Sequence, residues 1–220
     1  MANLNQKVYN AIALKAATLE SRLERGNNAN ILLKGEDEKG IKYVEKLTQK
    51  GVSFQLLENE LEIFQFLYEE GAQVPILHED TLSGDSEGIV MQLINNAATL
   101  GDYAEGYVEG IVPIEVLKEI MEASLEAIDF MHKLKVIHND LHANNIVISL
   151  VNGSWKAYII DFGWSYFWQD GIPDWIEYER TWCADGPDED LRYLQEDIEG
   201  RLPKEAHDEE FLYVTGMLKR

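Results

Sequence analysis

The sequence predicts an α+β protein in which a small lobe built on an antiparallel sheet precedes a mainly helical lobe. Three observations predict this architecture. Short extended segments separated by polar turns occupy much of residues 1–95, a long amphipathic pattern begins at Pro113, and the pair Asn152-Gly153 separates two more extended segments. We therefore expect an N-lobe over residues 1–95 and a C-lobe over residues 96–220.

The first predicted elements alternate between helix and strand. Residues 5–25 place apolar side chains three and four positions apart, which favours an amphipathic helix. Extended segments around residues 31–33 and 41–47 flank a polar turn and predict a hairpin. Residues 54–70 return to the helical spacing, so a second helix is expected to follow the hairpin.

A second hairpin is predicted before the lobe boundary. Its strands are the extended segments over residues 74–82 and 88–94, which flank a polar run. In the second half, Pro113 suits the first turn of a helix and Asn152-Gly153 suits a tight hairpin turn. The elements expected there are a helix over residues 113–135, strands over residues 145–150 and 155–160, and helices over residues 188–198 and 205–218.

The composition favours a folded protein and excludes several kinds of partner. Hydrophobic residues make up 45% of the 220-residue chain, which is long enough to bury a sizeable core. The formal net charge of −21 would repel nucleic acids and anionic membranes, so we expect neither as a partner, whereas a cationic acceptor is permitted. No apolar run approaches the roughly 20 residues of a membrane span, and the N-terminus lacks a signal-peptide pattern, so a cytoplasmic location is expected. The single cysteine, Cys183, is expected to pack rather than react.

The chemistry is expected to centre on two short motifs that bracket the second-half hairpin. Residues 138–145 have the sequence HNDLHANN, with an asparagine five positions after the aspartate, and the second motif is Asp161-Phe162-Gly163. Phosphoryl transfer needs a carboxylate that orients the nucleophile and hard oxygen ligands for a divalent metal. Asp140, Asn145 and Asp161 supply these groups in the required order.

These motifs resemble the catalytic and metal-binding loops of protein kinases, RIO-type kinases and aminoglycoside phosphotransferases, which share a two-lobe protein-kinase-like fold. The resemblance implies that ATP binds between the lobes, that Asp140 positions or deprotonates the acceptor hydroxyl, and that Asn145 and Asp161 hold Mg²⁺. His142 stands where protein kinases usually carry lysine and small-molecule kinases often carry histidine. It is a candidate contact to the transferred phosphate or a residue that stabilises the turn.

The same resemblance requires a lysine that binds phosphate and a glutamate that pairs with it. Lys46 in the second predicted strand and Glu60 in the following helix match these positions. Lys42, Lys50 and Glu58 are the alternatives.

Two further segments are candidates for binding the nucleotide. The segment that begins at Gly26 is similar to the glycine- and asparagine-containing phosphate loops of aminoglycoside phosphotransferases, although Gly26 also suits a helix cap. Residues 91–94, with Met91 and Leu93, resemble the hinge whose backbone groups bind adenine. A buried strand is the other interpretation of this segment, and both can hold.

Three other residues characterise this chain within the resemblance. Asn139 replaces the arginine that many protein kinases place before the catalytic aspartate, so activation by loop phosphorylation is not expected. His138 is expected to be architectural. Asp190 resembles the acidic residue on a later helix that anchors the catalytic loop, with a solvated acidic helix as the alternative.

We therefore predict an ATP- and Mg²⁺-dependent phosphotransferase that moves the γ-phosphoryl group to a hydroxyl acceptor. A protein Ser/Thr side chain is favoured over a small molecule, because few residues follow Gly163 and no acceptor insertion is visible. The alternatives are a small-molecule kinase of the aminoglycoside phosphotransferase type, a RIO-like ATPase and a nucleotide-binding pseudokinase.

Overall fold

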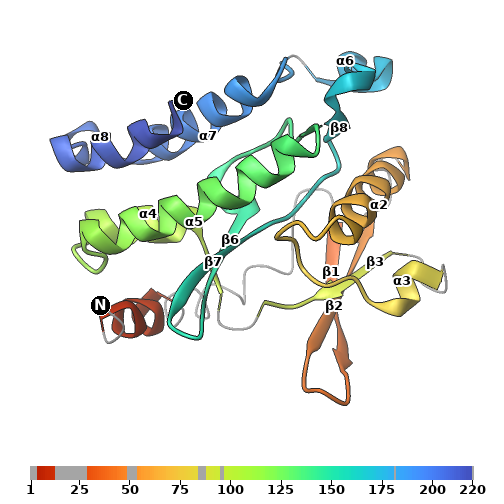
Figure 1. Cartoon of the computed structure of the whole chain (residues 1–220), viewed down its shortest axis with the longest axis horizontal. Coiled ribbons are helices and arrows are strands. Elements are labelled where there is room, and N and C mark those ends of the chain that lie inside the picture. Colours follow the sequence, from red (N-terminus) through yellow and green to blue (C-terminus); the bar gives the residue numbers. More distant parts are fainter. Residues whose placement is uncertain are drawn as a thin grey trace.

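The computed structural model describes residues 4–12, 29–48, 54–83, 88–94, 97–180 and 182–219. The smaller lobe combines a sheet with one long helix: β1 (Ala29–Glu36), β2 (Lys42–Thr48), β3 (Ile89–Gln92) and α2 (Phe54–Glu69). The larger lobe is mainly helical and contains α4 (Leu100–Val108), α5 (Ile114–Lys133), α7 (Pro187–Arg201) and α8 (Glu209–Thr215). This arrangement, seen in Figure 1, confirms the predicted α+β fold with a small antiparallel-sheet lobe and a helical lobe.

The sheet of the smaller lobe has β2 at its centre, in the order β1-β2-β3, and both of its neighbours are antiparallel. Asp37 closes the turn between β1 and β2, because its Oδ1 accepts hydrogen bonds from the backbone N–H groups of Lys39 and Ile41, each at 2.9 Å. The predicted first hairpin is confirmed. Lys46 consequently lies in the central strand, opposite Ile89 of β3.

Helix α2 confirms the helix predicted after the hairpin. Its apolar residues lie on one face, and Ile63, Phe64 and Leu67 are almost fully buried. Burying each of these side chains stabilises the fold by roughly 1.5–3 kcal/mol. The buried face fixes the rotation of the helix and so decides which polar residues face the other lobe.

The predicted second hairpin is present only as a short antiparallel contact. Leu77 forms a bridge with Met91, the His78 N–H donates to the Val90 carbonyl at 2.9 Å, and the Gln92 N–H donates to the Ile76 carbonyl at 2.8 Å. The chain then forms a short helix, α3 (Glu79–Ser83). The buried Thr81 hydroxyl accepts a hydrogen bond from the Val90 N–H at 2.6 Å and donates one to the Val90 carbonyl at 3.2 Å. Strand pairing ends here because a side chain occupies the backbone donor that a longer strand would use.

Helix α4 was not predicted, because its two glycines, Gly101 and Gly106, lower the helix propensity of the segment. The helix begins at a capping box in which the side chains of Thr99 and Asp102 each accept from the other residue's backbone N–H. A cap of this kind stabilises a helix start by about 1 kcal/mol, which compensates for weak propensity.

The long helix and the hairpin predicted for the second half are confirmed. Helix α5 buries the expected apolar stripe, which includes Leu117, Ile120 and Met121. Strands β6 (Ile146–Val151) and β7 (Ser154–Ile159) pair antiparallel. Both turn residues between them have positive φ, 52° at Asn152 and 82° at Gly153, as the tight turn expected for this pair requires.

The C-terminal part contains more short elements than predicted. The helix expected over residues 188–198 is α7, whereas the one expected over residues 205–218 is divided into η3 (Lys204–Ala206), α8 and η4 (Gly216–Leu218). Asp208 caps α8 by accepting from the Phe211 N–H at 2.8 Å. The remaining short elements are β4 (Ala98–Thr99), β5 (Val136–Ile137), η1 (Ala143–Asn145), β8 (Tyr166–Phe167), η2 (Trp168–Asp170) and α6 (Asp174–Glu179).

Residues 4–12 are helical and pack on the larger lobe. Asn5 donates a hydrogen bond to Glu119 of α5 at 2.7 Å, and the ring of Tyr9 packs edge-on against Trp155, with centroids 6.3 Å apart. The first helix therefore lies beside the helical lobe, as Figure 1 shows, although it precedes the sheet in the chain. Its predicted continuation through residues 13–25 lies outside the described residues.

Two clusters of buried hydrophobic residues support the site. The larger one contains residues of both lobes, among them Leu67 of α2, Ile128 of α5 and Phe162. The smaller one forms around Tyr166 and Ile176, and Cys183 packs against it, as predicted for the single cysteine. The segment after Phe162 thus has its own small core.

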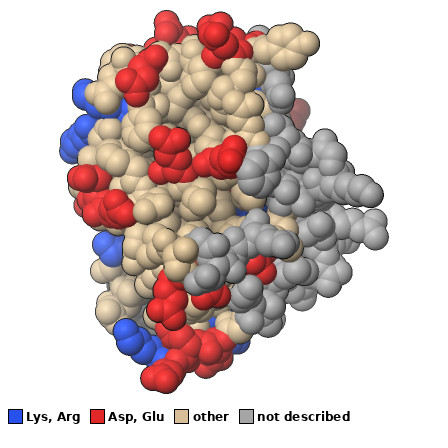
Figure 2. All heavy atoms as spheres, turned by 90° about the vertical axis from the view of Figure 1, so that its right-hand side faces the viewer, with Lys and Arg blue, Asp and Glu red and all other residues tan. Residues whose placement is uncertain are grey.

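On the face shown in Figure 2, carboxylates lie in several separate groups among uncharged residues, and lysine and arginine lie mainly along the left edge and near the bottom. None of the helices that the structure describes is long and apolar enough to cross a membrane.

A glycine beside the central strand provides a test of this packing. A Cβ added to Gly88 would lie 2.4 Å from the Lys46 carbonyl oxygen and 2.8 Å from Leu47 Cδ2. We expect Gly88→Ala to lower the free energy of unfolding by about 1–3 kcal/mol, because the backbone of β2 must move. Gly200→Ala is the control, since nothing lies within 4 Å of its added Cβ, and it should be neutral or stabilising. Urea denaturation measures both, and equal stabilities would contradict the packing.

Candidate active site

A buried aspartate of α7 anchors the loop of residues 138–145. The carboxylate of Asp190 is fully buried and accepts hydrogen bonds from the backbone N–H groups of His138 at 2.7 Å and Asn139 at 2.8 Å. Nε2 of His132 lies 3.1 Å from the same carboxylate. These partners offset the cost of burying a charge. The predicted anchoring role of Asp190 is confirmed, and the alternative of a solvated acidic residue is wrong.

Asn139 connects this loop to the segment that follows Phe162. Its φ of 60° lies in the left-handed region, which asparagine tolerates better than most residues. Its Nδ2 donates to the Trp164 carbonyl at 3.1 Å, and its Oδ1 accepts from the Ala184 N–H at 2.8 Å. A neutral amide therefore links two backbone segments at the position where many protein kinases carry arginine.

His138 has an architectural environment, as predicted. It is fully buried, its Nε2 lies 3.0 Å from the Ile160 carbonyl, and its ring packs on Phe162 with centroids 5.3 Å apart. Ser165 donates a hydrogen bond to the His138 carbonyl at 3.0 Å. Both its ring and its backbone are thus occupied by structural contacts.

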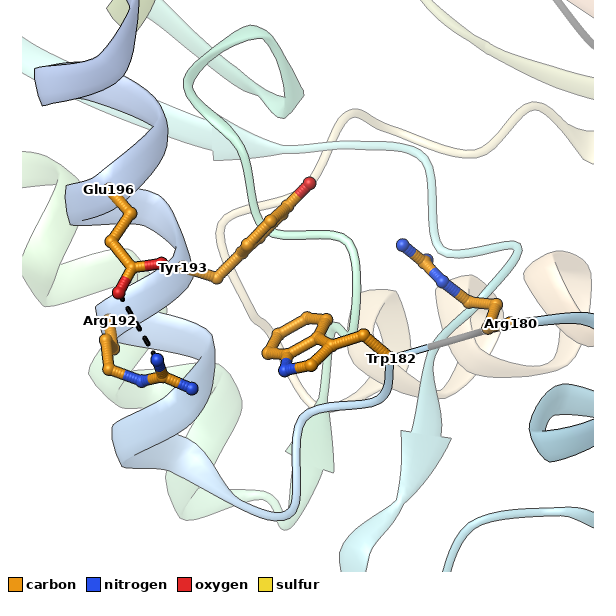
Figure 3. Close-up of a pocket in the computed structure, with 5 residues that line it drawn as sticks. All are labelled: Arg180, Trp182, Arg192, Tyr193 and Glu196. Atoms are coloured by element: carbon orange, nitrogen blue, oxygen red, sulfur yellow. Dashed lines mark hydrogen bonds and ion pairs between the residues drawn. The ribbon is translucent and has the colours of Figure 1, made fainter.

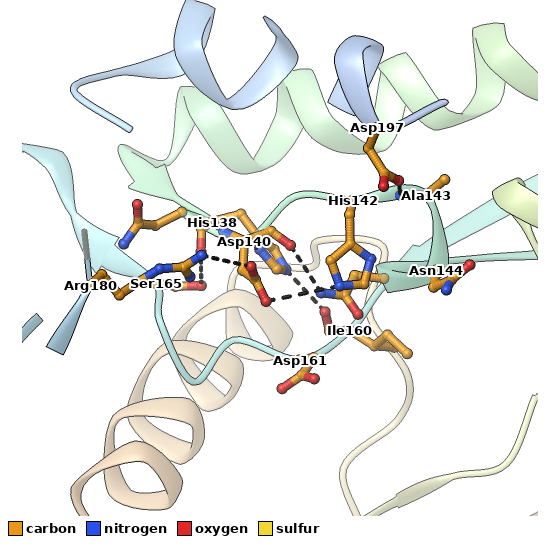
Figure 4. Close-up of polar contacts among 12 residues, drawn as sticks. His138, Asp140, His142, Ala143, Asn144, Ile160, Asp161, Ser165, Arg180 and Asp197 are labelled. Carbon is orange, nitrogen blue, oxygen red and sulfur yellow. Dashed lines mark hydrogen bonds and ion pairs between the residues drawn. The ribbon is translucent and has the colours of Figure 1, made fainter. Parts of the chain in front are cut away.

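The side chain of Asp140 lies between those of Arg180 and His142, as Figure 4 shows. Its Oδ1 lies 2.9 Å from Nη2 of Arg180, and its Oδ2 lies 3.9 Å from Nε2 of His142. Its carbonyl accepts from Asn145 Nδ2 at 3.0 Å. One carboxylate oxygen is therefore paired with a permanent cation, and the other faces only an imidazole beyond hydrogen-bond distance.

The side chain of His142 makes no hydrogen bond to the described residues. Its Nδ1 is buried without a partner, and its Nε2 is 3.9 Å from Asp140. Burial lowers the pKa of His142, although the charge of Asp140 opposes that shift. The imidazole is therefore mostly neutral near pH 7, and a turn-stabilising hydrogen bond from its ring is not present.

Asn145 and Asp161, the predicted metal ligands, lie at the start of β6 and just after β7. Asn145 is nearly buried, and because its Nδ2 donates to the Asp140 carbonyl, its amide oxygen is directed away from that bond. Asp161 has a φ of 68° and a side chain that is half exposed. The hairpin therefore brings the two motifs together, as the sequence predicts.

Lys46, Glu60 and Asp161 form one charged network between the lobes. Nζ of Lys46 lies 2.9 Å and 2.7 Å from the two carboxylate oxygens of Glu60 and 2.6 Å from Oδ1 of Asp161. Of the alternatives, Lys42 and Glu58 are exposed, and Lys50 lies outside the described residues. The geometry therefore favours Lys46 and Glu60.

The charges in this network are unbalanced, since two carboxylates face one ammonium. Burial disfavours the charge on Lys46, but the two carboxylates outweigh it and raise the pKa of the lysine. Burial raises the pKa of Glu60 to about 7, because the attraction of Lys46 compensates only in part and Asp161 adds repulsion. Burial acts in the same direction on Asp161, but Lys46 prevails and lowers its pKa. Glu60 is thus the carboxylate that protonates first.

Phe162 of the second motif and Asn59, a residue that sequence reasoning missed, hold the segment after Asp161. Phe162 is fully buried against Phe64 of α2, with ring centroids 5.6 Å apart. Nδ2 of Asn59, also on α2, donates to the carbonyls of Ser165 at 2.8 Å and Gly163 at 3.0 Å. No local pattern identifies Asn59, because neighbouring residues of a helix point in different directions and only those three or four positions apart share a face.

The family model for the protein kinase domain matches residues 23–185 of the chain. The chain belongs to the protein kinase domain family. The match contains both motifs and the Lys46–Glu60 pair.

A solved structure of this fold extends the comparison to most of the chain. The structure described as WaaP in complex with acyl carrier protein matches with a TM-score of 0.51 and 15% identity, covering 89% of this chain and 87% of that chain. At this identity the likeness shows a shared fold and nothing about substrate.

The predicted adenine hinge of this kinase domain lies beside the strand that carries Lys46. Met91 lies opposite Val44 of β2, and the Leu93 N–H donates to the Lys42 carbonyl at 2.7 Å. The N–H of Leu93 is thus engaged within the sheet. Gly26, the predicted phosphate-loop glycine, lies outside the described residues.

A cavity of about 350 Å³ opens next to Arg180 in this kinase domain. Figure 3 shows Trp182 and Tyr193 between Arg180 on one side and Arg192 with Glu196 on the other. The two aromatic rings stack with centroids 4.9 Å apart. Burial and the charge of Asp140 raise the pKa of Tyr193, so the phenol lies within electrostatic range of the loop. The cavity therefore lies on the Asp140 side of the domain.

Replacement of Asp190 tests how the catalytic loop is held. Asp190→Ala leaves two buried backbone N–H groups and His132 without their acceptor, so we expect a loss of about 3 kcal/mol or more in unfolding free energy. Asp188→Ala is the control, because Asp188 is exposed in the first turn of the same helix. Thermal denaturation measures both, and similar melting temperatures would contradict the anchoring role.

The raised pKa of Glu60 predicts a pH dependence of stability. A folded-state pKa near 7 lies above the usual value of 4.5, so the folded state binds the proton more tightly between these limits. The contribution of Glu60 is complete below pH 4.5 and is lost as the pH rises through 7. We expect Glu60→Gln to flatten the stability profile between pH 5 and pH 8, and the exposed Glu58→Gln not to do so. Urea denaturation midpoints measured across this pH range test the prediction. Parallel stability profiles for the wild type and both variants would contradict it.

Proposed function

We propose that the chain is an ATP- and Mg²⁺-dependent kinase that transfers the γ-phosphoryl group to a hydroxyl acceptor. The observation that supports this most directly is the 2.6 Å contact between Lys46 and Asp161, because it joins the proposed phosphate-binding and metal-binding groups in one site. The pairing of Lys46 with Glu60 is the arrangement by which kinases hold the lysine toward phosphate.

Lys46 is proposed to bind the α- and β-phosphates of ATP. Its ammonium is charged and nearly buried, so its direction is set by Glu60 on one side and Asp161 on the other. A phosphate oxygen can replace the Asp161 oxygen as a partner of Lys46, since both are anionic. Adenine is proposed to lie at the segment of Met91 and Leu93.

Asn145 and Asp161 are proposed to hold Mg²⁺. An amide oxygen and a half-exposed carboxylate are hard ligands of the kind that magnesium prefers. Within the described part of the chain, no group of three or more His, Cys, Asp or Glu side chains could hold a metal ion. Two protein ligands suffice here, because phosphate and water complete the shell of magnesium in such enzymes. The bound ion would neutralise phosphate charge.

Asp140 is proposed to orient the acceptor hydroxyl and receive its proton. The hydroxyl oxygen forms a bond to the γ-phosphorus, and the bond from that phosphorus to the β–γ bridging oxygen breaks. ADP leaves with the bonding electron pair, and the hydroxyl proton passes to Asp140. Oδ2 is the oxygen available for this, since Oδ1 is paired with Arg180.

The acceptor is proposed to be a protein Ser/Thr side chain, with a small hydroxyl compound as the second candidate. The cavity beside Arg180 supports the second candidate, because its volume of about 350 Å³ falls in the range of small-molecule sites. Incubation with a cell extract and labelled ATP separates them, since the label enters either protein or low-molecular-weight material.

Transfer from radiolabelled ATP tests the proposed function. We expect Asp140→Asn to lower kcat by roughly 10²–10⁴-fold, because the proton acceptor is lost. Asp161→Ala and Lys46→Met should abolish transfer through loss of metal and phosphate binding. Asp188→Asn, exposed on α7, should keep wild-type activity.

Other outcomes identify the alternatives. Phosphate release without labelling of any acceptor would indicate an ATPase. The absence of both transfer and thermal stabilisation by ATP with Mg²⁺ would refute the kinase proposal, since ligand binding raises stability only when the folded state binds.

A further inference from the structure

The transferring phosphoryl group needs a cation that the catalytic loop itself does not contain. Charge develops on its oxygens in the transition state, and kinase-type enzymes neutralise this charge with metal, lysine or arginine. Residues 138–145 include neither lysine nor arginine. Of the two histidines in this loop, His138 is buried with both ring nitrogens in backbone contacts, and His142 has a lowered pKa that leaves it mostly neutral.

Arg180 supplies a permanent cation at this point from a segment far along the chain. Its Nη2 lies 2.9 Å from Oδ1 of Asp140, and its guanidinium lies over the ring of Trp164 at 5.1 Å. Trp164 in turn stacks on Trp175 of α6, with centroids 5.9 Å apart. The guanidinium is therefore supported on one face and directed at the proposed catalytic aspartate, as the left side of Figure 4 shows.

The second terminal nitrogen of Arg180 has no partner in the part of the chain that the structure describes. Nη1 is buried and makes no hydrogen bond within the described residues. A buried guanidinium donor without an acceptor is energetically unfavourable, so an anionic oxygen placed there would be bound favourably. Arginine is suited to this because its fork can donate to two anionic groups at once.

We propose that Arg180 contacts the transferring phosphoryl group through this unpaired donor. The proposal rests on the proposed function, since it assumes that Asp140 binds the acceptor hydroxyl. That hydroxyl must lie within about 3 Å of Asp140 and about 3–3.5 Å of the γ-phosphorus. The guanidinium of Arg180 already lies 2.9 Å from Asp140. A rotation of the Arg180 side chain would bring it to the phosphoryl oxygens. Arg180 thus holds Asp140 through Nη2 and stabilises the phosphoryl group through Nη1.

Binding of a transition-state analogue tests this directly. Isothermal titration measures the affinity for ADP and Mg²⁺ with and without aluminium fluoride, which mimics the phosphoryl group in flight. The wild-type protein should gain affinity when aluminium fluoride is present. Arg180→Ala should lose at least about 10-fold of that gain while its affinity for ADP alone changes less than about 3-fold, because the ground state does not use Nη1. Retained ADP affinity also shows that the variant is folded.

Turnover gives a second and independent readout. We expect Arg180→Ala to lower kcat by at least about 100-fold with little change in the KM for ATP, since an arginine on the transferring group contributes roughly 10³–10⁵ in other enzymes. Guanidinium ion at millimolar concentration should restore part of the activity of Arg180→Ala, which a purely structural role would not allow. Arg180→Lys should retain intermediate activity. Lys133→Ala removes an exposed charge at the end of α5 and serves as the control.

The two possible failures are distinguishable. A wild-type protein that binds neither ADP nor its aluminium fluoride complex overturns the proposed function, and this inference with it. A wild-type gain in affinity that Arg180→Ala retains, or activity of Arg180→Ala that equals the wild type, overturns the role of Arg180 alone.

Discussion

The contact of Lys46 with two carboxylates is the interaction on which the site depends. It connects the central strand of the sheet, helix α2 and the residue after β7, which no single local element could bring together. The nearly buried Glu60 carboxylate would be costly to bury without the ammonium, and the largely buried ammonium would be costly without its carboxylate partners. The lobes are therefore held in one relative position by charge as well as by the apolar core.

A second constraint acts on the backbone of the two motifs. Asn139 and Asp161 both have positive φ, a conformation that costs energy for residues other than glycine. Asp190 offsets this cost in the first case by accepting two backbone hydrogen bonds, and Lys46 holds the side chain in the second. Asp190 of α7 thus stabilises the loop of residues 138–145, and Lys46 of β2 stabilises the segment after β7.

The segment after Phe162 combines packing with chemistry. Phe162 joins the common core, Asn59 satisfies the carbonyls that follow, and a small cluster around Tyr166 and Ile176 fixes the rest. This cluster positions Arg180 beside Asp140, although the two residues are 40 positions apart in the chain. A cation missing from the loop is thereby provided by a neighbouring element.

The sequence by itself determined the features that depend on local spacing. The positions of Asp140, Asn145 and Asp161, the Asn-Gly hairpin and the long helix α5 follow from motifs and periodicity, and the structure contains each of them. Only the tertiary structure decided the rest. A side-chain hydrogen bond limited the strand pairing of residues 74–82, and helix α4 depended on a cap and on packing. The choice of Lys46 over Lys42 depended on which ammonium reaches Glu60 and Asp161. The contacts of Asn59 and Arg180 link residues far apart in the chain, and no local pattern encodes such a contact because folding alone brings the partners together.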